Sequence, residues 1–206
     1  MMITPLEQLE CHWRQLPLLP VAVVHDVDEA IALADMLSAV GVPMVEVTLR
    51  TPRALAAIRA IREALPNMVV GAGTVCDLRQ LHAAREAGAL FAVSPGSTPE
   101  LLAAGHDYLL PGVATPSEIM VARAAGYRLL KFFPATAMGG TGVLSAMAGP
   151  FADVRFIPTG GIDSRNAATY LALPNVAAIG GSWLLPRQAT RRNLESLRTA
   201  VLALRR

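Results

Sequence analysis

The sequence is almost without lysine. Of its 18 basic residues, 17 are arginine, and Lys131 is the only lysine. Basic and acidic residues nearly balance at a formal net charge of +2, and aromatic residues make up only 5% of the chain. Scattered arginines with so few aromatic residues do not form the basic and aromatic platform that binds nucleic acid. We therefore expect no nucleic-acid partner.

Residue types that hold metals are also scarce. The two cysteines, Cys11 and Cys76, lie far apart and no CxxC motif occurs, so two free thiols are favoured over a disulfide. The four histidines show no metal-ligand spacing; they are His12, His25, His82 and His106. The sequence therefore predicts a protein without a metal site and without a cofactor.

Long apolar runs are missing as well. None reaches the roughly 20 residues that a membrane-spanning helix needs, and the stretch "LPLLPVAVV" is short and broken by two prolines. The opening "MMITPLEQLE" has neither the basic region nor the apolar region of a secretory signal. We expect a cytoplasmic protein without a membrane partner.

Apolar residues as a class are nevertheless abundant. They make up 53% of the 206 residues, against 17% charged residues. This composition excludes a disordered chain and suits a fold whose strands are buried on both faces. A chain of this length accommodates one domain with a substantial core, and two domains only with difficulty. We therefore expect residues 1–206 to form a single domain.

Short apolar runs alternate with alanine- and leucine-rich segments of helical periodicity. The runs cover residues 20–26, 44–50, 67–74, 90–96, 107–114, 128–135, 154–161 and 175–184, after an N-terminal helix near 4–16. Eight near-equal strand–helix units predict an α/β fold, a (β/α)8 TIM barrel with an extra N-terminal helix. An open doubly wound sheet is the competing arrangement.

Active sites of such barrels lie at the carboxyl ends of the strands, so polar residues there are the candidates. Glu46, Thr48 and Arg50 alternate along one strand and therefore share the face opposite to a row of apolar side chains. Lys131 and Phe133 share a face in the same way. We expect both sets to point into the barrel.

A buried glutamate and a buried lysine form a structural ion pair in one interpretation. Buried residues of these types are rare and costly, however, and a merely structural cation could be the arginine that this chain prefers. Lysine can lose its proton when it is desolvated or lies near another cation, and the free amine attacks carbonyl groups to form Schiff bases. The single lysine therefore indicates that an amine is required at Lys131, although chance is the remaining alternative.

Glycine pairs close the last two strands. The motif "PTGGI" brings Thr159, Gly160 and Gly161, and "IGGSW" brings Gly181 and Ser182. Successive glycine amides can cradle an anion, and phosphate sites of barrels lie after strands seven and eight. Tight turns alone are the alternative reason for such glycines. Both pairs together favour a phosphate site.

These candidates jointly suggest a substrate. A Schiff-base amine needs a ketone or an aldehyde, and the glycine pairs hold a phosphate. Arg50 and Thr74 could hold a carboxylate next to the carbonyl, and Glu46 could move protons. A keto acid with a phosphate at its far end satisfies all of these groups.

The ordered set of motifs resembles the KDPG/KHG aldolase family. From about Leu16 to about Pro186 it comprises "VEVTLRT", "GAGTV", "SPG", "LPGVATPSE", "KFFPA", "VRFIPTGGI" and "IGGSW". The resemblance implies a metal-free class I aldolase with a small (β/α)8 barrel, typically a homotrimer. It would cleave 2-dehydro-3-deoxy-6-phosphogluconate to pyruvate and glyceraldehyde 3-phosphate in the Entner–Doudoroff pathway. A second reaction would cleave 4-hydroxy-2-oxoglutarate to pyruvate and glyoxylate.

The resemblance also implies residue roles. Lys131 matches the Schiff-base lysine of the family and Glu46 its general acid/base. The implied substrate contacts are Arg50 and Thr74 at the carboxylate, Gly160, Gly161, Gly181 and Ser182 at the phosphate, with Pro95 and Phe133 as pocket walls. After "KFFPA" the chain continues "TAMGG", which differs from an acidic variant of some members and alters the rim of the site.

Three other functions fit parts of the pattern. A 2-dehydro-3-deoxy-6-phosphogalactonate aldolase would use the same lysine with the opposite configuration at C4. An isomerase or synthase barrel, such as a protein similar to thiamin-phosphate synthase, would use the glycine pairs but give Lys131 no role. A non-catalytic sugar-phosphate-binding protein is the third.

Overall fold

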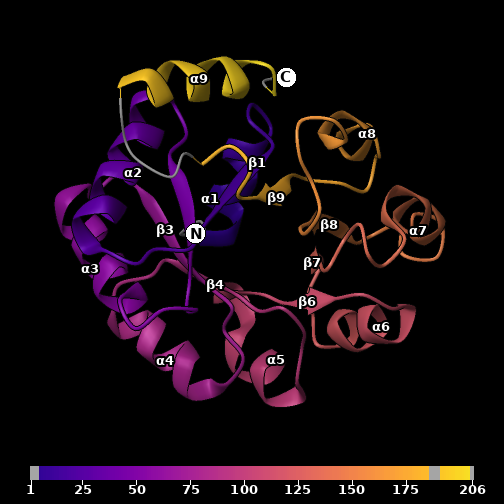
Figure 1. Cartoon of the computed structure of the whole chain (residues 1–206). Coiled ribbons are helices and arrows are strands. Elements are labelled where there is room, and N and C mark those ends of the chain that lie inside the picture. Colours follow the sequence, from indigo (N-terminus) through magenta and orange to yellow (C-terminus); the bar gives the residue numbers. More distant parts are fainter. Residues whose placement is uncertain (1–4, 186–190, 205–206) are drawn as a thin grey trace.

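The computed structural model describes residues 5–185 and 191–204, in which strands and helices alternate (Figure 1). The strands are β1 (Leu18–Ala22), β2 (Met44–Thr48), β3 (Val69–Gly73), β4 (Phe91–Val93), β5 (Leu109–Leu110), β6 (Gly112–Val113), β7 (Leu129–Phe132), β8 (Arg155–Pro158) and β9 (Ile179–Gly181). The helices are α1 (Pro5–Trp13), α2 (Val27–Ala39), α3 (Ala54–Ala64), α4 (Leu78–Glu86), α5 (Pro99–Gly105), the 3-10 helix η1 (His106–Tyr108), α6 (Pro116–Ala124), α7 (Gly140–Met147), α8 (Ala167–Leu171) and α9 (Arg191–Leu202). Seven of the eight apolar runs predicted as strands contain at least one observed strand, and the run 20–26 overlaps β1, which begins two residues earlier at Leu18.

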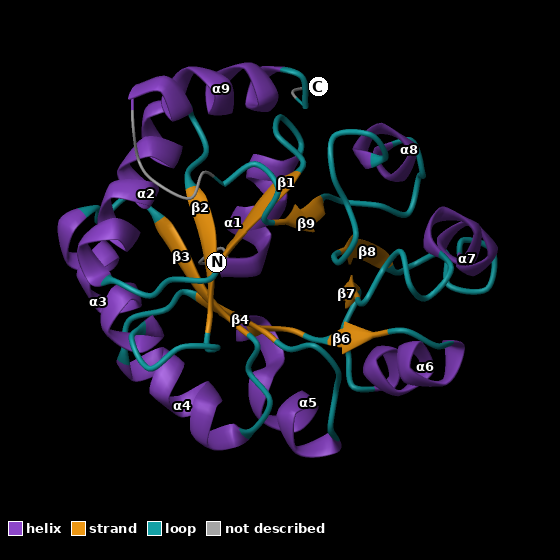
Figure 2. Cartoon of the chain, viewed as in Figure 1, coloured by secondary structure: helices purple, strands orange, loops and turns teal. Residues whose placement is uncertain are grey.

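All paired strands run parallel, which confirms the predicted α/β class. Six strands pair in the order β5-β4-β3-β2-β1-β9, and three in the order β6-β7-β8. Only Pro111 separates β5 from β6, and the isolated bridge between Thr159 and Gly180 links the ends of β8 and β9. The strands surround a common centre and the helices α2 to α9 lie outside them (Figure 2), unlike the layers of an open doubly wound sheet.

Two helices begin at residues whose side chains form capping hydrogen bonds. Thr98 accepts a hydrogen bond from the amide of Leu101 at the start of α5. Thr115 and Glu118 form a reciprocal capping box at the start of α6. In both helices proline occupies the first turn, where its missing N–H costs nothing. These caps fix where the chain leaves β4 and β6.

The strands bury a different set of side chains on each face. Val45 and Val47 of β2, like Leu130 and Phe132 of β7, pack in the larger core cluster with the outer helices. The alternation of strand side chains therefore turns Glu46 and Lys131 to the opposite, central face, as predicted.

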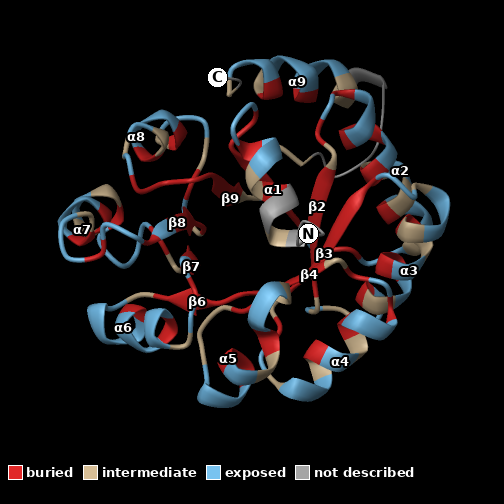
Figure 3. Cartoon of the chain, turned by 180° about the vertical axis from the view of Figure 1, so that it is seen from behind, coloured by how far each residue is buried: buried red, intermediate tan, exposed pale blue. Residues whose placement is uncertain are grey.

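Helix α1 packs over the amino ends of the strands. Its Leu9 and Trp13 join the smaller, central core cluster with side chains such as Met44 and Phe91, which begin β2 and β4. The indole nitrogen of Trp13 donates to the carbonyl of Leu18 at 3.2 Å. Seen from behind, α1 lies in front of the buried strands (Figure 3). The two sheets, β5-β4-β3-β2-β1-β9 and β6-β7-β8, together curve around the centre and are called the strand ring below. Helix α1 covers the amino end of this ring and leaves the carboxyl ends of the strands for a site.

No helix within the described ranges is long and apolar enough to cross a membrane.

Candidate active site

Lys131 and Glu46 meet at the centre of the strand ring. The Nζ atom of Lys131 on β7 lies 3.4 Å from Oε1 of Glu46 on β2, and the residues are only 6% and 0% exposed. The second carboxylate oxygen, Oε2, is buried without a hydrogen-bond partner in the described structure. A buried unpaired acceptor is costly, so the contact with the only lysine leaves the Glu46 carboxylate incompletely satisfied by protein groups.

Gly73 makes room for the Glu46 carboxylate. It ends the neighbouring strand β3, where it pairs in register with Thr48. A Cβ atom at Gly73 would overlap Oε1 of Glu46 and lie 2.7 Å from its carboxyl carbon. Sequence reasoning gave this glycine no role, although "GAGT" closes a predicted strand as the candidate motifs do.

The three polar residues predicted to share one face of β2 lie in three different environments. Thr48 is buried and donates through Oγ1 to the carbonyl of Ala22 on β1 at 3.0 Å, so its hydroxyl supports the strand ring. Arg50 lies beyond the end of β2 and is exposed, at the rim of the ring. Only Glu46 of the three takes part in the central polar pair.

Arg50 and Thr74 form a second polar pair at this rim. The Nε atom of Arg50 donates to Oγ1 of Thr74 at 3.3 Å. Thr74 adopts a positive φ of 59°, a conformation that is unusual for a β-branched residue. The backbone is thus held in a strained form that places the hydroxyl beside the guanidinium, where both can donate to a carboxylate.

Phe133 lies between the lysine and the glycine turn that follows β8. Its ring centroid is 5.3 Å from Nζ of Lys131. A Cβ atom on Gly160 would lie 3.3 Å from the same ring. Pro95, the other predicted wall, is half-buried, and its carbonyl would be overlapped by a Cβ atom at Gly112 of β6. Phe133 therefore follows the lysine's own strand β7, and Pro95 lies against β6, which pairs with β7.

The predicted phosphate segments adjoin one another. Gly160 and Gly161 have positive φ angles of 100° and 76°, and the bridge from Thr159 to Gly180 brings this turn beside the end of β9. A Cβ atom at Gly180 would overlap Oγ1 of Thr159. The glycines therefore permit a close approach of two backbone segments, which a tight turn alone would not require.

Some amides in these segments face no protein acceptor. Within the described residues, the N–H groups of Gly161 and Ser182 donate no hydrogen bond to another residue. Gly181 packs against Trp183, since a Cβ atom there would overlap the indole ring, and Ser182 is exposed. Unpaired amides beside glycines form the type of cradle that binds an anion.

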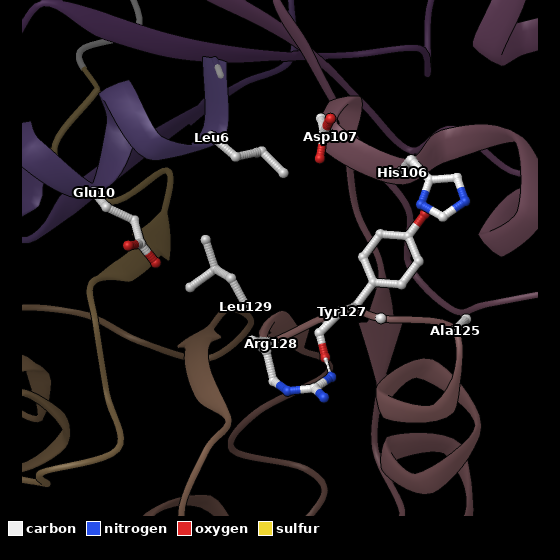
Figure 4. A pocket seen from close by; sticks show the side chains of 9 residues that line it. Leu6, Glu10, His106, Asp107, Ala125, Tyr127, Arg128 and Leu129 are labelled. Carbon is white, nitrogen blue, oxygen red and sulfur yellow. Dashed lines mark hydrogen bonds between the residues drawn. The ribbon is translucent and has the colours of Figure 1, made fainter. Parts of the chain in front are cut away.

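A separate cavity of about 260 Å³ opens at the amino end of the strands (Figure 4). It lies between α1, η1 and the start of β7, and its polar lining includes Glu10, His106, Asp107 and Arg128. Glu10 is paired with Arg155. This cavity contains none of the predicted site residues and faces away from the Lys131 amine.

Other reactive groups do not gather near the lysine. Cys11 and Cys76 are free thiols at the surface. In the part of the chain that the structure describes, no three His, Cys, Asp or Glu side chains are placed to hold a metal ion.

Comparisons with known proteins agree with this geometry. The model of the KDPG and KHG aldolase family matches residues 9–199. The KHG/KDPG aldolase of Escherichia coli (strain K12) is 51% identical over 176 residues, which cover 84% of this chain and 83% of that protein. The structure of the KDPG aldolase from Legionella pneumophila, with pyruvate captured as a covalent carbinolamine intermediate, is 42% identical. It has a TM-score of 0.88 and covers 96% of this chain and 98% of that one. The Zymomonas mobilis ZM4 2-keto-3-deoxy-6-phosphogluconate aldolase with 3-phosphoglycerate is 41% identical, with a TM-score of 0.88 and 96% of both chains covered.

Proposed function

The chain belongs to the KDPG and KHG aldolase family, and on that premise we propose that it is a class I aldolase that uses Lys131 as its Schiff-base amine. It cleaves 2-dehydro-3-deoxy-6-phosphogluconate to pyruvate and glyceraldehyde 3-phosphate, and 4-hydroxy-2-oxoglutarate to pyruvate and glyoxylate. The observation that carries the proposal is the buried contact of 3.4 Å between the only lysine and a carboxylate whose other oxygen is unpaired.

The first half of the reaction forms the iminium. The neutral amine of Lys131 attacks C2 of the keto acid and gives a carbinolamine. Glu46 returns a proton to the C2 oxygen, which leaves as water while the C2–N double bond forms. Because Oε1 of Glu46 lies 3.4 Å from Nζ, the carboxylate reaches both the nitrogen and the oxygen that are bonded to C2.

The second half breaks the C3–C4 bond. Glu46, directly or through a water molecule, removes the proton of the C4 hydroxyl, and the electron pair of the C3–C4 bond moves into the iminium. Glyceraldehyde 3-phosphate leaves, the enamine takes a proton at C3 from Glu46, and water hydrolyses the iminium to pyruvate. The unpaired Oε2 supports this use of one carboxylate as both base and acid.

The two ends of the substrate have their own contacts. We assign the pyruvyl carboxylate to Arg50 and Thr74, whose side chains are already in contact at 3.3 Å. We assign the phosphate to the turn of Thr159, Gly160 and Gly161 with the segment of Gly181 and Ser182, where amides are unpaired. Phe133 and Pro95 form walls between these ends.

Reductive trapping tests the proposal. Borohydride in the presence of pyruvate reduces the iminium to a stable secondary amine, which adds the mass of a reduced pyruvyl group. Because Lys131 is the only lysine, the adduct is expected on one peptide, and the α-amino group is the only other primary amine. Recovery of an unmodified Lys131 peptide after complete inactivation would sink the mechanism.

A conservative variant separates charge from nucleophilicity. Lys131→Arg keeps a cation beside Glu46 but cannot form an imine, so we expect no trapping and no aldol cleavage. Near-normal turnover of Lys131→Arg would contradict a Schiff base. It would favour isomerase or synthase chemistry, which gives the lysine no role, and absence of turnover in the unmodified chain would favour a binding protein.

The configuration at C4 is tested with epimers. The galactonate-type aldolase uses the same lysine chemistry, so trapping does not separate it from the gluconate type. We propose the gluconate type because the relatives at about 50% identity carry that name. Faster turnover of 2-dehydro-3-deoxy-6-phosphogalactonate than of its C4 epimer would reverse the assignment.

The remaining proposals concern the whole protein. We propose that residues 1–206 act as one domain whose strands close an eight-stranded barrel, with β5 and β6 as one strand interrupted at Pro111. We further propose a homotrimer, as the family resemblance implies, and a cytoplasmic location, as the sequence analysis expects. Sedimentation equilibrium at micromolar concentration is expected to give three times the 21.8 kDa of one chain, and a monomer mass would exclude the trimer.

A further inference from the structure

The carbonyl groups of the turn after β8 are each held by a donor from another segment. The backbone amides of Ala135 and Thr136, in the loop after β7, donate to the carbonyls of Thr159 at 2.8 Å and Gly160 at 3.0 Å. These two bonds use main-chain groups, so almost any side chains could make them. The loops after β7 and β8 are thereby joined by two consecutive main-chain hydrogen bonds beyond the ends of these strands.

The third carbonyl of the turn depends on side chains. The Gly161 carbonyl accepts from Oγ1 of Thr136 at 2.9 Å and from Nδ2 of Asn166 at 2.9 Å. The other amide atom of Asn166, Oδ1, accepts from the backbone N–H of Asp163 at 2.9 Å. Asn166 thus ties the start of the loop to its end, and Thr136 ties the same carbonyl to the neighbouring loop.

Tyr170 completes this arrangement. Its hydroxyl lies 3.2 Å from Oγ1 of Thr136, and the residue is buried on α8. A threonine hydroxyl has one proton, and that proton is directed to the Gly161 carbonyl, which can only accept. Tyr170 is therefore the donor and Thr136 the acceptor in the contact between them.

Because the peptide unit is planar, a bond that holds a carbonyl also orients the N–H group of the following residue. In a trans peptide the carbonyl and the following N–H point in opposite directions. The bonds to the carbonyls of Thr159 and Gly160 therefore fix the N–H groups of Gly160 and Gly161, and those to Gly161 fix the N–H of Ile162. Of these three N–H groups, those of Gly161 and Ile162 donate to no protein acceptor within residues 5–185 and 191–204.

We infer that Thr136, Asn166 and Tyr170 are positioning residues that hold the amides of residues 160–162 in the orientation that binds the substrate phosphate. The inference rests on the proposed function, because it deepens the phosphate assignment made there. Thr136 also lies at the position where "TAMGG" departs from an acidic variant, and a carboxylate could not donate to the Gly161 carbonyl as the hydroxyl does.

Kinetics with and without the phosphate test the inference. The substrates are 2-dehydro-3-deoxy-6-phosphogluconate and the same keto acid without its phosphate. Thr136→Val keeps the shape of the side chain and removes its donor, and one hydrogen bond is worth roughly a factor of 2 to 10. We expect KM for the phosphorylated substrate to rise by about that factor, while kcat and both constants for the unphosphorylated substrate stay as in the unmodified protein.

Two controls accompany the variant. Thr136→Ser restores the hydroxyl and is expected to restore KM. Thr199→Val makes the same change on the exposed face of α9, where Oγ1 donates to the Glu195 carbonyl, and is expected to leave both substrates unaffected. Reductive trapping with pyruvate, which has no phosphate, is expected to proceed equally in all of these variants.

A double variant tests whether Tyr170 acts on the phosphate site through Thr136. Tyr170→Phe is expected to raise KM for the phosphorylated substrate in the unmodified background and to add nothing after Thr136→Val, because it acts through Thr136. Full additivity of the two changes would contradict this route. A variant of Asn166, Asn166→Ala, removes the second donor and is expected to act like Thr136→Val.

The kinetic results distinguish failure of the inference from failure of the proposed function. An equal rise of KM for both substrates in Thr136→Val, or no rise for either, would overturn the inference and leave the aldolase intact. If the unmodified protein shows no preference for the phosphorylated substrate, the phosphate assignment itself fails and the inference falls with it.

Discussion

The amine of Lys131 and the carboxylate of Glu46 lie 3.4 Å apart although 85 positions separate them in the sequence. They come from β7 and β2, which are not neighbours in either sheet, so the contact crosses the inside of the strand ring. An ion pair that served only stability would be expected to satisfy both carboxylate oxygens, because a buried unpaired acceptor costs free energy. The unpaired Oε2 of Glu46 therefore supports the proposed role of this carboxylate in proton transfer over a purely structural one.

Glu46→Gln is expected to slow every proton transfer but to keep the Lys131 amine. The amide keeps the size of the side chain but cannot act as a base or an acid. We expect exchange of the methyl protons of pyruvate with deuterium, followed by NMR, to slow by about 10²- to 10⁴-fold, and borohydride to trap pyruvate on Lys131 more slowly than in the unmodified protein but still on that residue. Glu63→Gln, on the exposed face of α3, is the matched control and is expected to exchange normally. An unchanged exchange rate in Glu46→Gln would require another base.

Gly73→Ala is expected to displace the Glu46 carboxylate without touching the substrate. The added Cβ atom would overlap Oε1 of Glu46, and both residues lie in strands that cannot move apart without losing ladder hydrogen bonds. We expect kcat to fall at least about tenfold, as for loss of part of the positioned proton transfer. Gly142→Ala in α7 is the matched control, since a Cβ atom there meets nothing within 4 Å. Full turnover of Gly73→Ala would show that the site tolerates the overlap.

Thr74→Gly is expected to weaken substrate binding and to relieve backbone strain at this position. The positive φ of 59° costs a residue with a side chain about 1–2 kcal/mol, and glycine avoids this cost but loses roughly 0.5–1 kcal/mol through its freedom in the unfolded chain. The free energy of unfolding is therefore expected to stay equal or to rise slightly. KM for pyruvyl substrates is expected to rise, because the hydroxyl that contacts Arg50 is lost.

The two halves of that prediction are measured separately. Urea unfolding gives the stability, and steady-state kinetics give KM. Thr74→Ser retains the hydroxyl and is expected to keep KM near that of the unmodified protein. A clear loss of stability in Thr74→Gly would mean that the backbone is not strained at this position, and an unchanged KM would remove Thr74 from the carboxylate site.

Periodicity was sufficient to predict the fold class and the inward faces of the strands. Alternation in "VEVT" and "LLKF" placed Glu46 and Lys131 on the central face, because each strand has only two faces and the other is apolar. The interruption between β5 and β6 was not predicted. The run 107–114 reads as one strand, but Pro111 has no N–H for the ladder and divides it.

Partners of individual side chains could not be predicted in the same way. Thr48 shares the face of Glu46, yet its hydroxyl bonds to the Ala22 carbonyl, because alternation gives a direction and not an acceptor. The room that Gly73 leaves for Glu46, and the bonds of Thr136 and Asn166 to the Gly161 carbonyl, depend on loop conformations that spacing does not specify. These contacts could be identified only from the three-dimensional structure.

Tyr108 and Tyr127 both have buried hydroxyls, but only one of the two hydroxyls has a hydrogen-bond partner among the described residues. Burial raises the pKa of Tyr108 from 10.0 to about 12, although the positive charge of Arg85 lowers it. Burial also raises the pKa of Tyr127 from 10.0 to about 12. The Tyr127 hydroxyl donates to the Leu102 carbonyl at 2.8 Å, whereas the Tyr108 hydroxyl is buried without a partner in the described structure. The guanidinium of Arg85 lies 4.5 Å from the Tyr108 ring centroid.

Removal of these two hydroxyls is therefore expected to have opposite effects at pH 7. Tyr108→Phe keeps the ring and its contact with Arg85 and removes an unpaired group, so the free energy of unfolding is expected to stay equal or to rise by up to about 1 kcal/mol. Tyr127→Phe loses a hydrogen bond and is expected to cost about 1 kcal/mol. Urea unfolding with an unchanged slope measures both, and destabilisation by Tyr108→Phe would mean that its hydroxyl has a partner.

The same pair predicts how stability depends on alkaline pH. A tyrosine is neutral below its pKa, and here the pKa in the folded protein lies above the ordinary value. The stability from burying each neutral ring is therefore complete below about pH 10 and is lost as the pH rises from 10 to 12, where the unfolded chain ionises first. In Tyr108→Phe one of the two ionisations is absent, so the loss of unfolding free energy between pH 10 and 12 is expected to be smaller. An equal loss in the variant would mean that Tyr108 does not contribute to alkaline unfolding.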